Sequence, residues 1–555
     1  MNYIKDLLKA LKPGINLDKA KKLAARKYKL NKVPTNIEIL NLLNDKERKL
    51  YKDYFITKPV RTLSGVAPIA VMTKPLPCPH AKKGGPCSYC PGGPGSVFGD
   101  IPQSYTGKEP ATMRGLRAGF DSYLQVFNRL EHYVILGQAP EKVELIIMGG
   151  TFPSFEKKYQ EEFVKYCFKA LNDFSAIFYK KNKFNYEKFN EFFELPCDVF
   201  NKERTKRIQD KLRKIKRKCV FVKEQERNEI SKIRCVGLTI ETRPDYGKLK
   251  EGNEMLRLGC TRVELGIQSV YDDVLEKIKR GHSINDSVES IRMLKDLGFK
   301  LNFHCMIGLP GVKSRELDGL KELFLNGDFK PDMLKIYPCM VMKGTKLYED
   351  YKKGKYKPLT TEKAAEIIAE FKKYVPEYCR IMRVQRDVPS YVTEAGPGRT
   401  NLRQYVNKIL KKKRIICKCI RCREIGRNIK KGKVRLKVLE YEASKGKEFF
   451  ISLEDDNSLY GFCRLRFPSE FLRKEITMDS ALIRELHVYG ELTELGKRGK
   501  IQHKGYGKLL LKKAEDISRK DRKNKIVVIS GIGVKEYYRN LGYKKEGVYM
   551  VKRMY

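Results

Sequence analysis

Five apolar runs that alternate with helical stretches constrain the fold of this chain more than any other feature. The runs are KVELIIMGG (142–150), CVGLTIET (235–242), TRVELGIQS (261–269), KLNFHCMIG (300–308) and MLKIYPCMV (333–341). Apolar strands that alternate with helices are typical of a parallel sheet with helical crossovers, because helices then cover the sheet. The sequence therefore predicts an α/β fold with a barrel or partial barrel over about 61–345.

The length and the changing pattern predict further domains on either side of this sheet. With 555 residues, the chain is too long for one hydrophobic core. We expect residues 1–60 to form a basic segment of three short helices that contacts RNA, and 174–232 to be a charged helical insertion in the barrel. Residues 346–433 are predicted as a basic linker, and 434–555 as a separate α+β domain.

The chain has a strong basic excess. Lys and Arg number 115 against 67 Asp and Glu, which gives a formal net charge of +48. A Lys-rich proteome is the ordinary explanation, but it usually raises Glu together with Lys. The excess therefore indicates a polyanionic partner, and nucleic acid is favoured over a membrane because no long apolar run or basic amphipathic anchor is present. The N-terminal residues do not resemble a secretory signal, so we expect a soluble, cytoplasmic protein.

Three cysteines in the loop PLPCPHAKKGGPCSYCPGGPG form the first candidate metal site. Fifteen cysteines without an export signal favour metal ligands over a disulfide framework. Cys78, Cys87 and Cys90 can hold three corners of a [4Fe-4S] cluster and leave one iron open to chelate S-adenosylmethionine. A zinc knuckle with His80 as the fourth ligand is the alternative that the loop alone leaves open.

The ends of three predicted strands carry residues that favour the cluster interpretation. Gly149 and Gly150 end the first run, and glycine lets the backbone approach a ligand closely. Glu241 and Arg243 lie at the end of the second run, and Gln268 lies near the end of the third. Barrel enzymes build their sites at the carboxyl ends of their strands, so we expect these residues to bind the cofactor.

A glycine-rich stretch in the C-terminal domain is the second candidate site. Gln502, Gly505 and Gly507 lie in QHKGYG, directly before the helix KLLLKKAEDISRK. Backbone N–H groups at a helix start can bind a pyrophosphate, although an ordinary tight turn has the same sequence pattern. Tyr537 and Tyr538 in the next helix can lie beside a thioester sulfur, as an acid or as an orienting hydroxyl. An acyl carrier fits better than a dinucleotide, because the βαβ framework of dinucleotide sites is missing.

With both sites in view, the chain resembles the family of the catalytic subunit of the Elongator complex, in its single-chain archaeal form. The resemblance covers nearly the whole sequence and rests on motifs such as CSYCPGGP, EKVELIIMGGTF, GLTIETRPDY, GCTRVELGIQSVYDDV, RELHVYG, QHKGYG and VISGIGVKEYYRNLGY. It implies a radical S-adenosylmethionine (radical SAM) partial barrel joined to a GNAT-type acetyltransferase domain. It also implies a tRNA-modifying enzyme that binds the anticodon stem-loop and installs a carboxymethyl group at C5 of the wobble uridine.

The resemblance also implies roles for individual residues. The three loop cysteines would hold a [4Fe-4S] cluster that cleaves S-adenosylmethionine, and the resulting radical would abstract hydrogen from the acetyl methyl of acetyl-CoA. The implied acetyl-CoA contacts are Lys142, Glu485, Leu486, His487, Val488, Tyr506, Gly507, Lys508 and Tyr538. The catalytic candidates are Lys142, His487, Tyr537 and Tyr538. Because Lys142 is far from the others in sequence, a ligand that contacts it and the C-terminal domain would touch both domains.

A second cysteine cluster lies in CKCIRCRE, between the two predicted domains. Cys417, Cys419 and Cys422 have a spacing that suits zinc, but a fourth ligand is missing locally. Either the three are free thiols, or the fourth ligand comes from Cys339, Cys379 or Cys463.

Two other functions compete with that of a radical enzyme. A protein lysine N-acetyltransferase with a structural iron–sulfur cluster would explain the C-terminal domain but not the residues at the strand ends, and a +48 enzyme would repel basic protein tails. A non-catalytic RNA-binding scaffold would not need the intact cysteines, glycine-rich loop and tyrosine pair. The sequence leaves the oligomeric state and any partner subunits open.

Overall fold

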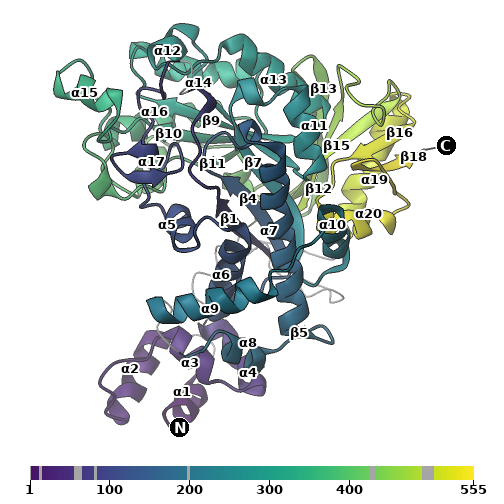
Figure 1. Cartoon of the computed structure of the whole chain (residues 1–555). Helices are drawn as coiled ribbons and strands as arrows, with labels where there is room; N and C mark the ends of the chain where they lie inside the picture. Colours follow the sequence, from purple (N-terminus) through teal and green to yellow (C-terminus); the bar gives the residue numbers. More distant parts are fainter. Residues whose placement is uncertain are drawn as a thin grey trace.

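The computed structural model of the chain has three regions (Figure 1): an N-terminal helical bundle, a parallel sheet covered by helices, and a C-terminal domain with its own sheet. It describes residues 2–11, 16–55, 65–80, 84–196, 201–425, 432–489 and 505–554. The predicted α/β class is confirmed. Among the described helices, none has the length and apolar character needed to cross a membrane.

Seven parallel strands form the central sheet, side by side in the order in which they follow in the chain. They are β1 (Val66–Met72), β4 (Lys142–Met148), β7 (Arg234–Thr242), β8 (Arg262–Gln268), β9 (Lys300–Ile307), β10 (Met333–Pro338) and β11 (Arg380–Arg383). The five strands predicted from apolar runs are all present. Two were not predicted, because Pro68 interrupts the apolar pattern of β1 and the four-residue β11 contains two arginines.

Side chains alternate between the two faces of this sheet, as they do along any strand. On β4, Val143, Leu145 and Ile147 are fully buried. The other face of β4 carries Lys142, Glu144, Ile146 and Met148, all of which are half-buried. The buried rows join the hydrophobic core, and the half-buried rows face the inside of a partial barrel.

Helices pack on the outer face of the sheet and beyond its edges (Figure 1). They are α5 (Pro110–Arg117), α6 (Ser122–Ile135), α7 (Lys157–Phe178), α11 (Leu249–Arg257), α12 (Asp272–Lys277), α13 (Ile284–Asp296), α14 (Glu316–Leu325), α15 (Lys346–Lys352), α16 (Thr361–Phe371) and α17 (Leu402–Lys412). Much of the segment 346–433, predicted as a linker, is therefore folded onto the sheet: β11 pairs with β10, and α16 packs against α14 and α17.

Two further hairpins and three helices complete this region. After the cysteine loop come β2 (Gly93–Ser96) and β3 (Gly99–Ile101), and after α7 come β5 (Tyr179–Lys180), β6 (Lys183–Phe184), α8 (Tyr186–Phe192), α9 (Lys202–Ile215) and α10 (Phe221–Ile230). The insertion predicted to begin at 174 starts later, because α7 continues to Phe178. The Arg204 guanidinium ties α9 to the region through Glu131 at 2.5 Å.

The N-terminal bundle contains four helices among the described residues, so the prediction of three is wrong. They are α1 (Asn2–Ala10), α2 (Leu17–Lys27), α3 (Asn36–Leu42) and α4 (Asp45–Phe55). The third predicted helix is divided at Asn44, whose side chain accepts from the Glu47 backbone N–H at 2.9 Å, while the Glu47 carboxylate accepts from the Asn44 N–H at 3.0 Å. This reciprocal cap starts a new helix.

The C-terminal domain has a seven-stranded sheet in which one neighbouring pair, β15 and β16, is parallel. The elements are α18 (Ile420–Arg423), β12 (Arg435–Ala443), β13 (Gly446–Glu454), β14 (Leu459–Phe467), β15 (Ser480–Val488), α19 (Tyr506–Lys520), β16 (Lys525–Val528), α20 (Lys535–Arg539), β17 (Lys544–Glu546) and β18 (Tyr549–Arg553). The parallel pairing ends at Ile483 and Val528, so β15 continues beyond its partner.

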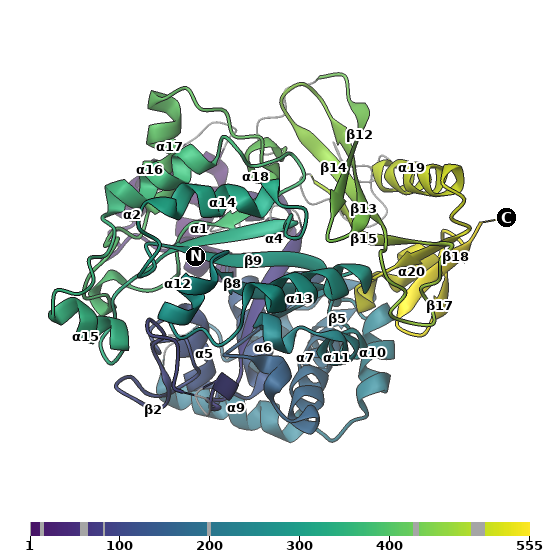
Figure 2. The same cartoon turned by 90° about the horizontal axis from the view of Figure 1, so that it is seen from above.

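The C-terminal sheet packs against the amino-terminal edge of the central sheet (Figure 2). Arg466 and Arg484, both essentially fully buried, reach across this interface. Arg466 Nε donates to Asp296 at 2.7 Å, and Arg484 Nη1 donates to Asp332 at 2.9 Å. Because Asp332 directly precedes β10, the C-terminal domain closes the bottom of the partial barrel.

Candidate functional site

A cavity of about 530 Å³ lies inside the partial barrel and reaches the carboxyl ends of its strands. This chamber is lined by the three loop cysteines and by four residues predicted to bind the cofactor: Cys78, Cys87, Cys90, Gly150, Glu241, Arg243 and Gln268. A volume of this size suits a cofactor or substrate site. The fold thus brings together, around one cavity, residues that are far apart in sequence.

Two side chains donate to the cysteine sulfurs. Arg280 Nη1 lies 3.5 Å from Cys87 Sγ, and Gln103 Nε2 lies 3.4 Å from Cys90 Sγ. Donors to cysteine sulfur tune iron–sulfur clusters. Burial raises the pKa of the Cys90 thiol to about 11, so a bound metal centre would be needed to hold it as a thiolate. Sequence analysis missed Arg280 and Gln103, because neither lies in a recognisable metal-binding pattern.

Buried polar atoms that lack hydrogen-bond partners indicate whether the chamber suits the implied cofactor. Among the described residues, Arg243 Nη1 and Arg280 Nε are buried and have no hydrogen-bond partner. Both residues line the chamber. An unpaired buried donor costs about 1–3 kcal/mol, so such atoms are uncommon in native proteins. A carboxylate-bearing ligand such as S-adenosylmethionine would supply the missing acceptors, and the residues present therefore fit the implied group.

The two cysteine clusters differ in their spacing. The sulfur atoms of Cys417, Cys419 and Cys422 all lie within 4.8 Å of one another, whereas the loop cysteines form no such compact group among the described residues. Because zinc binds thiolates at about 2.3 Å, its sulfur ligands must lie close together. His80 is not among the residues that line the chamber, and its ring packs against Gly281. These observations favour a larger cluster over a zinc knuckle in the first loop.

The strand ends have backbone conformations that fit a close approach. Gly149 has a φ of +119°, and a Cβ there would lie 2.2 Å from the Thr73 hydroxyl oxygen. That hydroxyl donates to the Gly149 carbonyl at 2.9 Å. Gln268 has a φ of +69°, which is strained for a residue with a side chain. Strain of this kind persists where a side chain must be held in one position, here at the wall of the chamber.

Charged side chains on the inner face of the strands form the chamber floor, and sequence analysis missed them. Glu264 is almost fully buried and lies 2.8 Å from His304 Nε2, and the Lys335 ammonium contacts the same carboxylate. Lys335 Nζ also lies 3.8 Å from Glu241, which accepts from the Tyr105 hydroxyl at 3.0 Å. The sequence did not reveal these residues because they lie within apolar runs. Only the fold shows which side of each strand faces the chamber.

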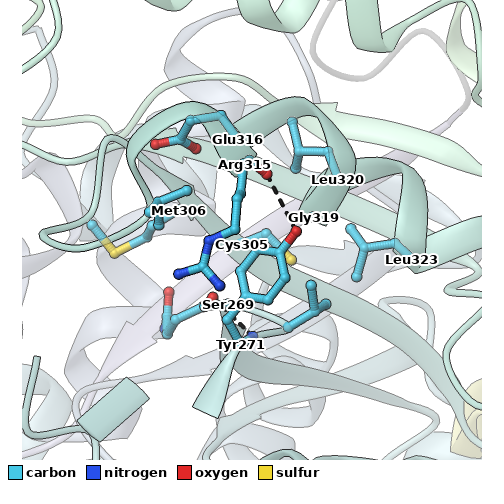
Figure 3. A pocket seen from close by; sticks show the side chains of 12 residues that line it. Ser269, Tyr271, Cys305, Met306, Arg315, Glu316, Gly319, Leu320 and Leu323 are labelled. Atoms are coloured by element: carbon cyan, nitrogen blue, oxygen red, sulfur yellow. Dashed lines mark hydrogen bonds between the residues drawn. The ribbon is translucent and has the colours of Figure 1, made fainter. Parts of the chain in front are cut away.

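A much smaller cavity of about 20 Å³ lies between the outer face of the sheet and α14 (Figure 3). Tyr271, Arg315 and Glu316 help to line it. Burial raises the pKa of Glu316 to about 7, and its carboxylate accepts from the Gly308 N–H at 2.6 Å. The space holds about one water molecule, which excludes it as a cofactor site.

The second candidate site lies where β15 and β16 part. Gly505, in the left-handed conformation with a φ of +80°, caps the start of α19, whose first turn contains Tyr506, Gly507 and Lys508. A Cβ on Gly507 would lie 2.8 Å from the Tyr537 hydroxyl oxygen, so the predicted tyrosine lies over the predicted glycine. The rings of Tyr537 and Tyr538 meet edge to face at 5.3 Å. The predicted Gln502 lies outside the described residues.

The predicted contacts on β15 are divided between its two faces. Glu485 and His487 face the central sheet: Glu485 pairs with Lys300 at 3.1 Å, and the His487 ring lies 4.4 Å from that of Tyr489. Leu486 and Val488 alternate with them, and Val488 lies 4.0 Å from the Cβ position of Gly507. The side chains of Glu485 and His487 therefore lie on the opposite face of β15 from those of Leu486 and Val488. One ligand can contact all four residues only through the backbone of the strand.

Electrostatics distinguish the two polar residues of β15. Burial would raise the pKa of Glu485, but Lys300 and Arg464 lower it to about 2. Burial lowers the pKa of His487 to about 4, so its imidazole is neutral at pH 7.

Lys142 lies at the junction of the two domains. It begins β4 on the same face as Ile146 and Met148, which line the chamber. With about 3.3 Å per residue, Lys142 is about 20 Å from Met148 along the strand. Its register partner is Arg234, and a Cβ on Gly533 of the C-terminal domain would lie 2.5 Å from Arg234 Cβ. Lys142 is therefore at the bottom of the barrel interior and the cysteines are at the top.

Family models match four consecutive parts of the chain. They are the ELP3 N-terminal domain (3–63), the Radical SAM superfamily (78–324), the Radical_SAM C-terminal domain (331–412) and the Acetyltransferase (GNAT) family (423–543). The fold and the sites thus define a class of transferase in which a radical SAM domain is joined to a GNAT domain.

Full-length relatives identify the family within this class. The chain is 45% identical to the tRNA uridine(34) acetyltransferase of Methanocaldococcus infernus, covering 99% of this chain and 98% of that protein. It is 38% identical to human Elongator complex protein 3, over 100% and 96% of the two chains. A solved structure of Methanocaldococcus infernus Elp3 with residues 1–46 deleted has a TM-score of 0.72 at 39% identity, and the match covers 89% of this chain and 100% of that one. The chain belongs to the Elongator complex protein 3 family.

Proposed function

We propose that this enzyme modifies the wobble uridine of tRNA, using S-adenosylmethionine and acetyl-CoA to install a carboxymethyl group at C5. The Methanocaldococcus infernus relative is named tRNA uridine(34) acetyltransferase, and the net charge of +48 suits an RNA substrate. When bound, an iron–sulfur cluster with S-adenosylmethionine supplies a carbon-centred radical able to remove hydrogen from an acetyl methyl group. Cys78, Cys87 and Cys90 would hold the cluster, and Arg243 and Gln268 would orient its ligand.

One observation carries this proposal: the cysteine loop lies at one end of the barrel interior, and the C-terminal domain lies at the other end, beside Lys142. The cysteines open on the chamber at the carboxyl edge, whereas the C-terminal domain closes the amino edge beside Lys142. The approximately 20 Å between the ends is within reach of a long, flexible acyl carrier. Protein acetylation would require neither the chamber nor this alignment.

Acetyl-CoA hydrolysis by the anaerobically reconstituted full-length protein tests the proposal. Hydrolysis is measured with and without tRNA that carries a wobble uridine, and 5-carboxymethyluridine is measured by mass spectrometry. We expect both only with tRNA and S-adenosylmethionine, and loss of hydrolysis in Lys142→Ala and Tyr538→Phe. Lys188→Ala, an exposed lysine of α8, is the matched control. Hydrolysis that ignores tRNA, or acetylation of protein tails instead, would overturn the proposal.

We further propose that Cys417, Cys419 and Cys422 bind a structural zinc ion. Hydrogen bonds from the other two thiols lower the pKa of Cys419, and Lys372 Nζ lies 3.6 Å from Cys422 Sγ. Such a thiolate cluster suits zinc. Metal analysis of purified protein should find one zinc per chain, lost in Cys419→Ser and kept in Cys167→Ser, which changes a cysteine buried in α7. Equal zinc content in the two variants would contradict the site.

A further inference from the structure

A carboxylate–imidazole pair on the chamber floor has no role in the function proposed so far. Glu264 and His304 lie on neighbouring strands, β8 and β9, and their side chains meet at 2.8 Å between Oε2 and Nε2. Both residues line the chamber that contains the three cysteines. Asn302 Nδ2 donates to the other oxygen of Glu264 at 3.0 Å, and Lys335 donates to Oε2. The carboxylate is thus fixed from three sides.

This arrangement determines which nitrogen of His304 carries the proton. The Lys335 ammonium, together with His304 and Arg262, holds the pKa of Glu264 well below its usual range in spite of burial, so the carboxylate is ionised and can only accept. His304 Nε2 must then donate, which leaves a lone pair on Nδ1. Among the described residues, no group is hydrogen-bonded to Nδ1. Burial and the neighbouring Lys335 lower the pKa of His304, so the ring is neutral and able to accept a proton.

We propose that His304 is the proton acceptor for the uracil ring in the chamber and that Glu264 is its positioning residue. This inference rests on the proposed function, because it assigns a destination to the hydrogen that leaves C5. A carboxylate that orients an imidazole and stabilises its protonated form is a recurring device of acid–base catalysis. The pair lies on rigid strands at the wall of the chamber, where a base inserted from outside would meet it.

The step balances in atoms and electrons. A carbon radical adds to C5 and takes one electron of the C5–C6 double bond, which leaves an unpaired electron on C6. The C5–H bond then breaks, and its proton goes to His304 Nδ1. Two of the three remaining electrons restore the double bond, and the third passes to a one-electron acceptor of the iron–sulfur class. Hydrolysis of the thioester follows as a separate reaction.

A metal ion is the competing interpretation of these residues. Ligand atoms of Glu241, Glu264 and His304 all lie within 4.8 Å of one another, a spacing that a metal ion can bridge. However, the Lys335 ammonium contacts Glu264 and lies 3.8 Å from Glu241, so a cation already occupies the space between the two carboxylates. Lys335 therefore provides the charge that a metal would otherwise supply.

Two measurements test the assignment, and the first needs no cofactor. In ¹⁵N NMR spectra of imidazole-labelled apo-protein at pH 7, the signal lost in His304→Gln should be that of a neutral ring with Nε2 protonated and Nδ1 free. An imidazolium signal, or the opposite tautomer, would overturn the proposal. So would a stoichiometric metal that is present in the wild type and absent from His304→Gln.

The second measurement follows the C5 hydrogen during turnover. With tRNA deuterated at uridine C5, His304→Gln should form carboxymethylated product about 10²–10⁴-fold more slowly and show a primary isotope effect, while 5′-deoxyadenosine formation stays within about twofold. His132→Gln, which changes another half-buried histidine outside the chamber, is the matched control and should behave as wild type. Wild-type product rates in a folded His304→Gln or His304→Asn would overturn the role of His304. Absence of product from the wild type would instead overturn the proposed function.

Discussion

Two buried arginines at opposite edges of the central sheet, Arg484 at the domain interface and Arg280 at the chamber, differ in how their charge is balanced. At the domain interface, Arg484 contacts the carboxylates of Asp332 and Glu448. At the chamber, Arg280 donates to the Gly266 carbonyl and the Cys87 thiol, and no carboxylate lies within ion-pair distance among the described residues. A buried guanidinium group that is paired with carboxylates stabilises the contact between the domains. A buried guanidinium group without a carboxylate indicates a place where an anionic ligand supplies the negative charge.

The largest effect on stability is expected when a carboxylate that pairs with the interface arginines is removed. Asp332→Asn should lower the free energy of unfolding by about 3–5 kcal/mol, because the buried Arg484 loses one of the two carboxylates that balance its charge. Urea unfolding measures this change. Asp273→Asn, which breaks an exposed pair with Arg315, is the matched control and should cost no more than about 1 kcal/mol. Similar losses in both variants would remove the distinction between the two edges.

Acid should weaken the interface next, through His487. Its folded-state pKa of about 4 lies below the ordinary 6.5, so the unfolded chain binds the proton first as pH falls. The stability contributed by the neutral ring is present above about pH 6.5 and is lost between about pH 6.5 and 4, amounting to up to about 3 kcal/mol. Denaturant curves at pH 7 and 4.5 should therefore differ less for His487→Gln than for the wild type. An equal difference between pH 7 and 4.5 in the two proteins would show that protonation of His487 does not lower the free energy of unfolding.

A smaller effect is expected at the rim of the chamber. Gly149→Ala should cost about 1–3 kcal/mol, because the new Cβ would lie 2.2 Å from the Thr73 hydroxyl oxygen at a φ of +119°. Gly150→Ala makes a matched comparison, since its Cβ would have no neighbour closer than 3.8 Å. Thermal unfolding and S-adenosylmethionine binding should both rank Gly149→Ala as the more damaging change. The reverse order would contradict the close approach at Thr73.

The smallest effect on stability should accompany a complete loss of bound iron. Cys78→Ser should change the free energy of unfolding of the cluster-free protein by about 1 kcal/mol or less, because the half-buried thiol makes no ion pair. Iron content after anaerobic reconstitution should nevertheless fall to background. Cys235→Ser, at a buried cysteine outside the chamber, should keep its iron. Full iron retention in Cys78→Ser would remove this residue from the ligand set.

Sequence patterns predicted the five central strands and the α/β class because burial on both faces leaves long apolar runs. They did not predict β11, whose four residues carry too little hydrophobic signal and are held by pairing with β10. The linker prediction for 346–433 failed for a different reason, because basic residues on the outside of the folded helices α15, α16 and α17 resemble those of a solvated linker. The division of α3 from α4 depended on a local cap at Asn44.

The candidate site was predictable where a residue type is unusual for its position, as with three cysteines in one loop or paired glycines at a strand end. Arg280, Glu264 and His304 could not be identified in this way. The sequence alone does not show on which face of the sheet a charged residue within an apolar run lies, because that depends on the register of the strand.

The interface arginines also determine how this protein can be divided. Arg464, Arg466 and Arg484 belong to the C-terminal half, but Asp296 and Asp332, which neutralise much of their charge, belong to the other half. A shortened chain that ends or begins between the halves would expose guanidinium groups meant for a dry environment. Loss of activity in such a fragment would then report a collapsed fold rather than a missing catalytic group. The two halves therefore need to be expressed and assayed as one piece.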